Sequence, residues 1–461
     1  MGNSAPGRRR RRTTSALRAT LLLSLAGCER DAEPHVKPDN VIVLLADTLR
    51  ADHMSLYGYA RDTTPALRKL AADGVVFEHA RSQAPCTFPS VNSLLTSRTP
   101  LAFYGRGYGD FGIPDDVPSL ATMLQRHGFA TLAVSASALV RATPSKHNKV
   151  GGFQQGFDAF DEQWLSRAAS CVNERALRLI DDAAKPFFLY VHYMDPHAPY
   201  QPPPEHRRRF AREWSGAPQI GAGDLRVVER TIFKHKRPDL VPAEDVFHLR
   251  DLYDDEIAYL DAQIDGLFAA LERRELLERT MVVLAADHGE EFLEHASLGH
   301  CRTLYDTETR TPLVLWIPGV PGGRIAAAVE NLDVVPTVLD YLALPIAADL
   351  EGTSLRPLIA GRAQEATRLT RGFTRSLRSL GGTRHKVILD TTTGAATAFD
   401  LAVDPGEASD LLGQGSATRE LLALRDQLVA QLARTEGENV ARNARHGQEI
   451  EAALRSLGYL E

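Results

Sequence analysis

The sequence predicts an α/β fold in which a large, mostly parallel sheet has helices on both faces and is followed by a small C-terminal antiparallel sheet. Apolar runs typical of buried strands recur at 41–46, 75–77, 130–134, 187–192, 281–286 and 313–317. Helical patterns such as PALRKLAADG and SLATMLQRHG separate these runs. Such alternation is typical of parallel sheets, whose strands are buried on both faces. The later segments HKVILD and TAFDLA predict short antiparallel strands.

The composition excludes some classes of partner. With 461 residues, of which 44% are hydrophobic and 24% charged, the chain is long enough for a large core plus a smaller second unit. A formal net charge of -6 gives no general attraction to nucleic acid, so we expect no nucleic-acid partner. The sequence leaves the oligomeric state open.

The N-terminus has the parts of a secretory signal, namely a basic run at 8–12, an apolar stretch and small residues before Cys28. The apolar stretch is too short to span a bilayer. Its end, Leu25 to Cys28, resembles the bacterial lipobox, which makes Cys28 the expected lipidation site; an ordinary cleaved signal is the alternative. We expect a lipoprotein signal peptide at 1–27 and a tether at 28–39. The protein would then be exported to the bacterial cell envelope and anchored to a membrane by lipid, at the periplasmic or outer face.

Three cysteines remain once Cys28 is assigned, namely Cys86, Cys171 and Cys301. So small and odd a set allows one disulfide but no disulfide framework. No CxxC or paired His/Cys spacing indicates a structural zinc.

A catalytic α/β domain is expected at 40–320. Its longest helical pattern runs from about 243 to 277, where leucines and isoleucines form one apolar stripe that we interpret as core packing. The stretch 203–243 carries Arg and Pro clusters and is interpreted as an inserted loop region. For 321–461 we expect a C-terminal subdomain with a helix at NLDVVPTVLDYLA, the small sheet and a helix at 416–434.

Polar side chains stand at the ends of two expected strands. Asp287 and His288 follow the apolar run MVVLAA, and Asp47 follows NVIVLLA in the same way. Open α/β sheets place their sites at the carboxyl ends of their strands. Carboxylates and imidazoles are suitable ligands for divalent metals. The two strand ends therefore predict a metal site.

Five longer blocks contain or accompany these residues. They are ADTLRADHMSLYGYARDTTPALRKLAADGVVF at 46–77, APCTFPSVNSLLTSR at 84–98, FFLYVHYMDPHAPYQPPP at 187–204, DHGEEFLEHASLGHCRTLYDTETRTPLVLWIPG at 287–319 and FDLAVDPGEASDLL at 399–412. Together, and in this order, the blocks resemble the sulfatase family of the alkaline phosphatase superfamily. The resemblance implies an alkaline-phosphatase-like fold, a sulfate or phosphate ester as the substrate, and one divalent metal ion.

By this resemblance, Asp47, Asp287 and His288 fall on metal-binding positions. Many family members carry a second acidic residue where this chain has Thr48, so the site has one carboxylate fewer. Fewer charges and an imidazole favour zinc or manganese, without excluding magnesium or calcium.

The nucleophile position departs from the family pattern. Typical sulfatases carry Cys-x-Pro-x-Arg, whose cysteine is converted to formylglycine. Here Pro89 fixes the register and Thr87 stands two residues before it, whereas Cys86 is one place early and Val91 replaces the arginine. We therefore expect no formylglycine and a threonine at the nucleophile position.

A threonine alcohol attacks only after losing its proton to a metal or a base. A bound metal lowers the pKa of a ligated water from about 16 to about 7, and a ligated alcohol should respond in the same direction. Thr87 would also open the helix SVNSLLTSR, whose N-terminus stabilises an oxyanion. Asp47, Thr87, Asp287 and His288 are therefore interpreted as a single-metal ester site. The alternative is that Thr87 only caps its helix.

The resemblance assigns catalytic roles to two further histidines. His197 matches the position that contacts the ester, and an imidazole suits protonation of a leaving group near neutral pH. His300 falls where many relatives place a lysine on the substrate oxyanion. The Lys and His motif that many sulfatases carry after the strand at 130–134 is not recognisable, and Glu290 and its neighbours remain unassigned.

Three functions are compatible with these residues. In the first, a lipid-anchored metal-dependent hydrolase attacks a sulfate or phosphate ester through Thr87. Family membership favours sulfate esters, whereas phosphate or phosphonate esters suit a threonine better because water can release a phospho-threonine. The second function is a phosphoethanolamine-type transferase that moves a phosphoryl-linked headgroup to an acceptor. The third is an inactive family member acting as a binding protein, because the usual Cys, Arg and Lys are missing.

Overall fold

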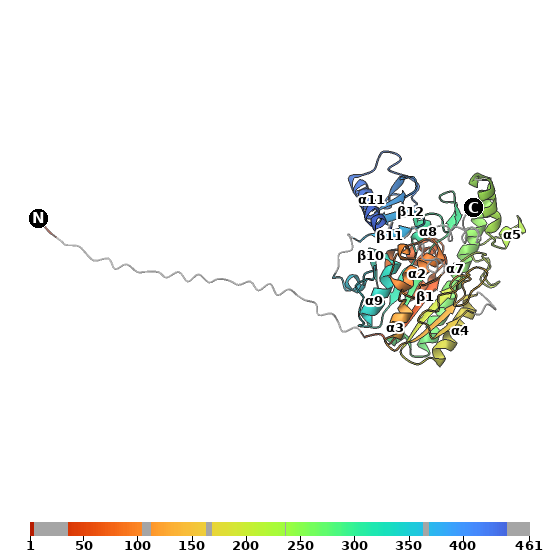
Figure 1. The fold of residues 1–461 in the computed structure, drawn as a ribbon, viewed down its shortest axis with the longest axis horizontal. Coiled ribbons are helices and arrows are strands. Elements are labelled where there is room, and N and C mark those ends of the chain that lie inside the picture. Colours follow the sequence, from red (N-terminus) through yellow and green to blue (C-terminus); the bar gives the residue numbers. More distant parts are fainter. Residues whose placement is uncertain (4–35, 104–111, 163–167, 236, 363–367, 440–461) are drawn as a thin grey trace. The chain divides into compact units, whose positions relative to one another are not determined.

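The large sheet is built around β1 (Asn40–Ala46), whose seven residues are all buried. The computed structural model describes residues 1–3, 36–103, 112–162, 168–235, 237–362 and 368–439, and within them the sheet has the order β10-β2-β9-β6-β1-β5-β3-β4 (Figure 1). The other strands of this sheet are β2 (Val75–Arg81), β3 (Ala130–Ser135), β4 (Ala159–Asp161), β5 (Phe187–Tyr193), β6 (Thr280–Ala286), β9 (Leu313–Trp316) and β10 (Gly323–Glu330). Every strand expected from an apolar run is present.

The expected mostly parallel arrangement is confirmed. Neighbouring strands run parallel except around β9, which is antiparallel to both β2 and β6. β10 lies beyond residue 320, where the C-terminal subdomain was expected to begin, yet it pairs with β2. The large sheet therefore continues past that residue.

The three central strands end in register. Ala46 of β1 lies opposite Ala286 of β6 on one side and opposite Tyr193 of β5 on the other. Because these pairs are parallel, the residues that follow them leave the sheet at the same edge. This register places Asp47 and Asp287 side by side.

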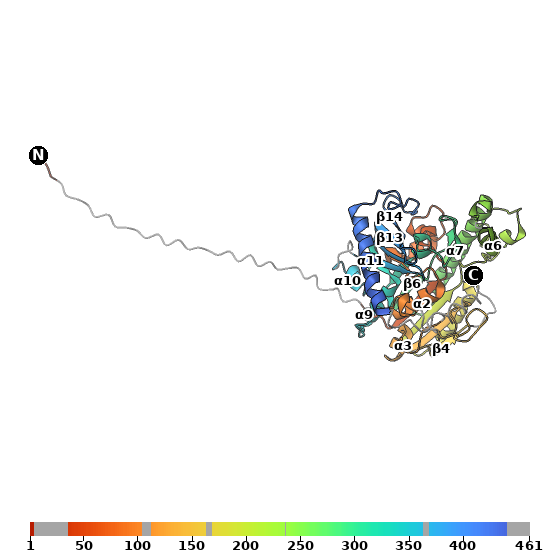
Figure 2. The same cartoon turned by 45° about the horizontal axis from the view of Figure 1, so that its top comes forward.

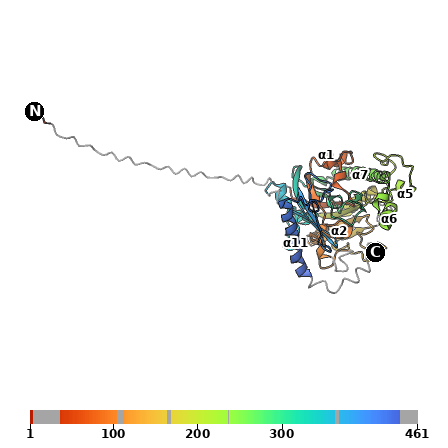
Figure 3. The same ribbon diagram turned by 90° about the horizontal axis from the view of Figure 1, so that it is seen from above.

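Helices cover both faces of the sheet, as expected. One face packs against α1 (Pro65–Leu70), α4 (Ala169–Asp182) and α7 (Ala243–Glu272), and α1 lies beside α7 (Figure 3). The opposite face packs against α2 (Thr87–Thr96), α3 (Leu120–Gln125) and α9 (Val334–Tyr341). The apolar stripe of α7 is buried in the core, as interpreted from its spacing.

Several short elements complete this part of the chain. The expected inserted region at 203–243 contains two helices, α5 (Pro218–Gly221) and α6 (Arg226–His235). After β6 the chain forms a two-stranded sheet from β7 (Glu291–Phe292) and β8 (Leu298–Gly299). The short helices α8 (Asp306–Thr309) and α10 (Arg356–Ile359) follow.

The small C-terminal sheet is antiparallel, as expected, with its strands adjacent in sequence order. Its strands are β11 (Thr370–Phe373), β12 (Leu377–Gly381), β13 (His385–Asp390) and β14 (Ala396–Asp400). Helix α11 (Arg419–Asn439) lies along this sheet (Figure 2) and buries Leu421, Leu424 and Leu428 against it.

The expected signal segment and Cys28 lie outside the residues that the structure describes. Within the described residues, none of the helices combines the length and apolarity that crossing a membrane requires.

Candidate functional site

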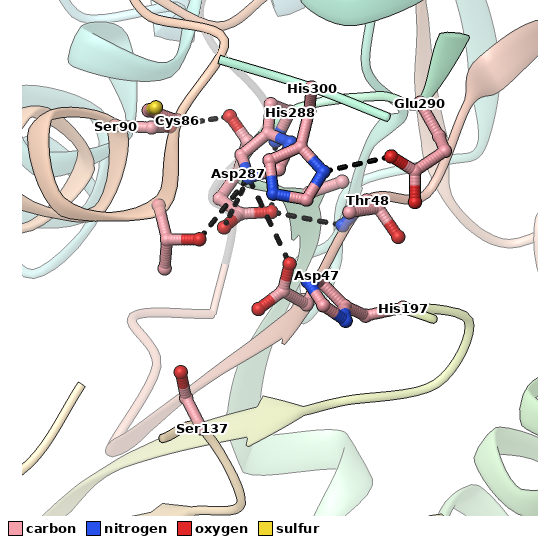
Figure 4. Close-up of polar contacts among 12 residues, drawn as sticks. Asp47, Thr48, Cys86, Ser90, Ser137, His197, Asp287, His288, Glu290 and His300 are labelled. Carbon is pink, nitrogen blue, oxygen red and sulfur yellow. Dashed lines mark hydrogen bonds and ion pairs between the residues drawn. The ribbon is translucent and has the colours of Figure 1, made fainter. Parts of the chain in front are cut away.

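Three neighbouring strands deliver buried polar side chains to one edge of the sheet. Asp47 follows β1, Asp287 follows β6, and His192 is the second-last residue of β5. One ligand atom from each of the three lies within 4.8 Å of the other two. All three side chains are almost completely excluded from solvent. Figure 4 shows the side chains of Asp47, Asp287 and His288 turned toward one another.

Each of the two carboxylates has one buried oxygen that receives no hydrogen bond from the part of the chain that the structure describes, and that oxygen is left for a cation. Asp287 Oδ1 accepts the backbone N–H of Thr48 at 3.1 Å and that of His288 at 2.9 Å. Asp287 Oδ2 and Asp47 Oδ1 are buried and have no hydrogen-bond donor among the described residues. Burying unpaired anionic oxygens is costly unless a cation compensates them. This arrangement fits a divalent metal ion.

The two acids have opposite pKa shifts. Burial and the charge of Asp47 raise the pKa of Asp287. Burial also acts to raise the pKa of Asp47, but the surrounding histidines, His197 first, outweigh it and hold this pKa well below its usual range. Because like charges so close disfavour joint ionisation, Asp47 carries the charge more readily when no metal is bound.

His192 is a candidate ligand that the sequence analysis missed. Its Nε2 lies 3.3 Å from Asp47 Oδ2, and its Nδ1 lies 2.9 Å from the hydroxyl of Tyr190. A hydrogen bond of this kind on the second ring nitrogen fixes the orientation of metal-ligating histidines. The available signal was a lone imidazole near the end of the apolar run FFLYVHY.

The structure places the predicted residue His288 beside both carboxylates and in contact with Thr87. His288 Nε2 lies 3.2 Å from Thr87 Oγ1, 3.4 Å from Asp287 Oδ2 and 3.9 Å from Asp47 Oδ1. Its Nδ1 lies 2.9 Å from the carbonyl oxygen of Gly289, which can only accept a hydrogen bond. The proton of the neutral ring is therefore on Nδ1, and the lone pair of Nε2 points toward the site.

Thr87 begins α2, and its position does not match a simple helix cap. The cap residue is Cys86, which makes no side-chain cap hydrogen bond, whereas the buried Thr87 hydroxyl contacts His288. The hydroxyl of Ser90 donates to the carbonyl oxygen of Asp287 at 2.5 Å and so ties the first turn of α2 to the end of β6. Thr87 is thus fixed at a helix N-terminus, where the helix dipole stabilises negative charge.

Thr48 holds Asp287 with its backbone instead of binding a metal with a carboxylate. Its φ angle is 60°, in the left-handed region that β-branched residues rarely adopt. This conformation lets the Thr48 N–H donate to Asp287 Oδ1. Since His192 approaches from the neighbouring strand, an imidazole is available to replace the missing carboxylate as a ligand.

His300 and His197 lie beside the carboxylate cluster. The ring centroid of His300 is 4.5 Å from that of His288 and 5.2 Å from that of His197. His300 Nδ1 contacts Glu290 Oε1 at 2.8 Å (Figure 4). Tyr200 donates to the other oxygen of Glu290 at 3.1 Å. Burial acts to lower the pKa of His300, but the charge of Glu290 outweighs it and raises the pKa to about 9. A pKa in this range makes His300 a cation at neutral pH, which is compatible with the expected role beside an oxyanion.

Other residues near the site have structural partners. After β3, where many sulfatases carry the Lys and His motif, this chain has Ser137. Its hydroxyl accepts the backbone N–H groups of Leu139 and Val140 and so stabilises a turn. Glu291, left unassigned by the sequence, contacts His295 Nδ1 at 2.6 Å. The disulfide that the sequence allowed joins Cys86 to Cys301, and Cys171 is a free thiol.

A mostly parallel sheet whose strand ends gather buried carboxylates, imidazoles and a hydroxyl at a helix N-terminus is typical of ester hydrolases that use a metal ion. The sulfatase family model matches residues 39–344, and a model described as N-sulphoglucosamine sulphohydrolase, C-terminal, matches residues 294–435. The chain therefore belongs to the sulfatase family. The resemblance seen in the sequence is confirmed, and Thr87 as the nucleophile stays a prediction.

Individual relatives agree with this assignment. An arylsulfatase from Clostridium perfringens is 23% identical over 468 residues, covering 86% of this chain and 95% of the relative. An N-acetylglucosamine-6-O-sulfatase from Bacteroides thetaiotaomicron is 22% identical and covers 73% and 74%. The structure of a phosphonate monoester hydrolase from Agrobacterium radiobacter superimposes with a TM-score of 0.70 at 20% identity, covering 86% of this chain and 96% of the other. At that identity, the structural likeness shows the fold.

Replacing Glu290 by glutamine is expected to lower the pH at which activity declines on the alkaline side. In the wild type the pKa of His300 is about 9, so the cation persists through neutral pH. Without the charge of Glu290, the largest influence that raises this pKa is gone while burial still lowers it, so the cation is lost at a lower pH than in the wild type. Profiles of kcat/KM between about pH 5 and pH 10 check this shift. Superimposable alkaline limbs would contradict it.

Proposed function

We propose that the protein hydrolyses a sulfate or phosphate ester through Thr87, with a divalent metal held by Asp47, Asp287 and His288 and with His192 as a further ligand. The observation that carries this proposal is the convergence of the Thr87 hydroxyl and the His288 Nε2 lone pair, 3.2 Å apart, beside two unpaired carboxylate oxygens. Zinc or manganese suits a ligand set of two carboxylates and imidazoles.

The chain's own residues account for the remaining parts of the reaction. When bound, the metal would lower the pKa of the Thr87 alcohol and neutralise the ester oxygens. Thr87 releases its proton to solvent water, and Oγ1 then forms a bond to sulfur or phosphorus while the bond to the leaving oxygen breaks. The N-terminus of α2 and the cationic His300 stabilise the oxyanion charge that develops. His197 protonates the leaving alcohol, and water afterwards cleaves the ester on Thr87, a step that a phosphate ester allows more readily than a sulfate ester.

The relatives of the chain and the chemistry of a threonine nucleophile favour different classes of ester. Named sulfatases among the relatives support sulfate esters. A threonine sulfate, however, has no neighbouring hydroxyl that could expel sulfate, whereas water can displace phosphate from a phospho-threonine. The structural likeness to a phosphonate monoester hydrolase adds only a shared fold. A panel containing both ester classes is therefore the appropriate test.

The decisive experiment combines metal analysis with that panel. Purified protein should contain about one equivalent of a divalent metal. It should hydrolyse at least one of an aryl sulfate, an aryl phosphate, a phosphate diester and a phosphonate monoester, and a chelator should abolish turnover reversibly. Protein that binds no metal, or that turns over none of these esters after metal addition, would overturn the proposal.

We further propose that the enzyme acts outside the cytoplasm, held to a membrane by lipid on Cys28. The lipobox-like end of the signal segment supports this placement. The Cys86–Cys301 disulfide adds support, because such bonds persist in oxidising compartments. Cell fractionation tests the anchor, since the wild type should sediment with membranes and C28S should not.

A further inference from the structure

The Cys86–Cys301 disulfide connects the two segments that carry the proposed nucleophile and the proposed oxyanion cation. Cys86 directly precedes Thr87 at the start of α2, and Cys301 directly follows His300. The two cysteines are 215 residues apart in sequence, and their Cα atoms are 4.7 Å apart. Figure 4 shows Cys86 next to Ser90 in the first turn of α2. One covalent bond therefore links both functional side chains through their immediate neighbours.

A backbone hydrogen bond next to the disulfide joins the same two segments. The N–H of Cys301 donates to the carbonyl oxygen of Pro85 at 2.8 Å. Cys301 has a φ of 74°, in the left-handed region that residues with a Cβ seldom adopt. This conformation is held while the disulfide and the Pro85 bond keep the two segments together. On its other side, His300 is fixed by Glu290.

The disulfide is separate from the strand ends that carry the two carboxylates and His192. Asp47, His192 and Asp287 belong to the ends of β1, β5 and β6, which the sheet aligns. Both cysteines of the disulfide are partly exposed, so a small reductant has access to them. Breaking the bond should therefore disturb Thr87 and His300 and leave the carboxylate cluster in place.

We propose that Cys86 and Cys301 are positioning residues and that their disulfide is a redox-sensitive switch for the hydrolase. In the oxidised form the disulfide holds the Thr87 hydroxyl and the His300 imidazole at one reacting centre. In the reduced form the two segments separate and turnover falls. This inference rests on the proposed function, because it uses Thr87 and His300 in their proposed roles.

Reduction requires an external dithiol. A thiolate of the dithiol attacks one sulfur, the Cys86–Cys301 bond breaks, and a mixed disulfide forms. The second thiol of the reductant then displaces the remaining protein sulfur. The reductant ends as a cyclic disulfide, and the protein has gained two electrons and two protons as two thiols. Oxidised glutathione reverses the exchange.

The test compares oxidised and reduced full-length protein on the best ester of the panel. Dithiothreitol should lower kcat/KM at least tenfold, and oxidised glutathione should restore it. Metal content and the circular dichroism spectrum should stay unchanged, which a general loss of structure would not allow. Alkylation and mass spectrometry establish that Cys86 and Cys301 have been reduced.

Two variants complete the design. C171S removes the free thiol of α4 and should respond to reductant like the wild type. The double variant C86S/C301S should have low activity with or without reductant. Full reduction with kcat/KM changed less than twofold would overturn the proposal, as would loss of metal or of fold in parallel with activity. Where the double variant does not fold, the reduced wild type gives the result.

The two proposals fail in different ways. If T87A keeps wild-type turnover, Thr87 is not the nucleophile and the proposed function fails. If T87A is inactive and the reduced wild type is fully active, only the switch fails.

Discussion

Replacement of Thr87 by alanine is expected to lower kcat by about 10³-fold or more for every ester that the protein hydrolyses. The alanine variant has no oxygen that can form the covalent intermediate, and neither His288 nor the N-terminus of α2 can replace that oxygen. Because the carboxylates remain, the variant should still bind the metal. Steady-state rates together with metal analysis of the same preparations provide the measurement.

Thr87→Ser is the matched control for this loss. Serine keeps the hydroxyl at the start of α2 and removes only a methyl group, so measurable turnover should remain. Both variants should stay folded, since the alanine change removes one hydrogen bond to His288, worth about 1 kcal/mol. If the alanine variant turned over any ester within about tenfold of the wild type, a water molecule would be the nucleophile.

The sequence predicted the large sheet well because its strands are continuous apolar runs. β1, β5 and β6 are buried along their whole length, so no competing pattern obscures them. β10 was not predicted, because GRIAAAVE is rich in alanine, begins with exposed residues and has an irregular register between Ile325 and Ala328. Alanine and glycine have low strand propensity, and only pairing with β2 reveals the strand.

The candidate site was predicted where it follows local sequence and missed where it depends on strand order. Asp47, Asp287 and His288 come directly after apolar runs, so their positions were visible. His192 lies within its run and looked like part of a buried strand. Its nearness to Asp47 follows from the pairing of β5 with β1, a contact between residues 145 positions apart. The Cys86–Cys301 pairing is equally non-local and could not be assigned from spacing.

Two positions of the site differ from the family pattern, and at each of them a neighbouring residue offers the missing ligand or charge. Thr48 provides no carboxylate, but His192 on the neighbouring strand offers an imidazole in its place. His300 stands where many relatives have a lysine, and the buried Glu290 keeps it cationic. In both cases a second residue supplies the property that the substituted one lacks. Changes at Glu290 or His192 should therefore affect function as strongly as changes at the more obvious positions.

Replacing Asp287 by asparagine is expected to stabilise the metal-free protein and to abolish metal binding and turnover. The amide oxygen can still accept the N–H groups of Thr48 and His288, so the local fold is preserved. The change removes a buried charge next to Asp47, whose repulsion together with burial raises the pKa of Asp287. Without metal, we expect a gain of about 1–2 kcal/mol in the free energy of unfolding near neutral pH.

The stability gained by the asparagine variant without metal should increase as the pH rises from acidic to neutral. Because the pKa of Asp287 is raised in the folded protein, ionisation costs stability as the pH rises above the unfolded value of 3.8. The metal-free wild type should therefore lose stability relative to the asparagine variant between acidic and neutral pH. At low pH, where Asp287 is protonated in both states, the two proteins should be similar.

Metal addition should make the wild type more stable than the asparagine variant, the reverse of their order without metal. A metal at 100 times its dissociation constant stabilises the wild type by about 2.7 kcal/mol, whereas the asparagine variant gains nothing. Urea unfolding at several pH values, with and without metal, measures both effects. An asparagine variant that is less stable than the metal-free wild type at neutral pH would show that the carboxylates do not repel each other. The unpaired oxygens of Asp47 and Asp287 would then have a structural role, and the metal site would have to be sought elsewhere.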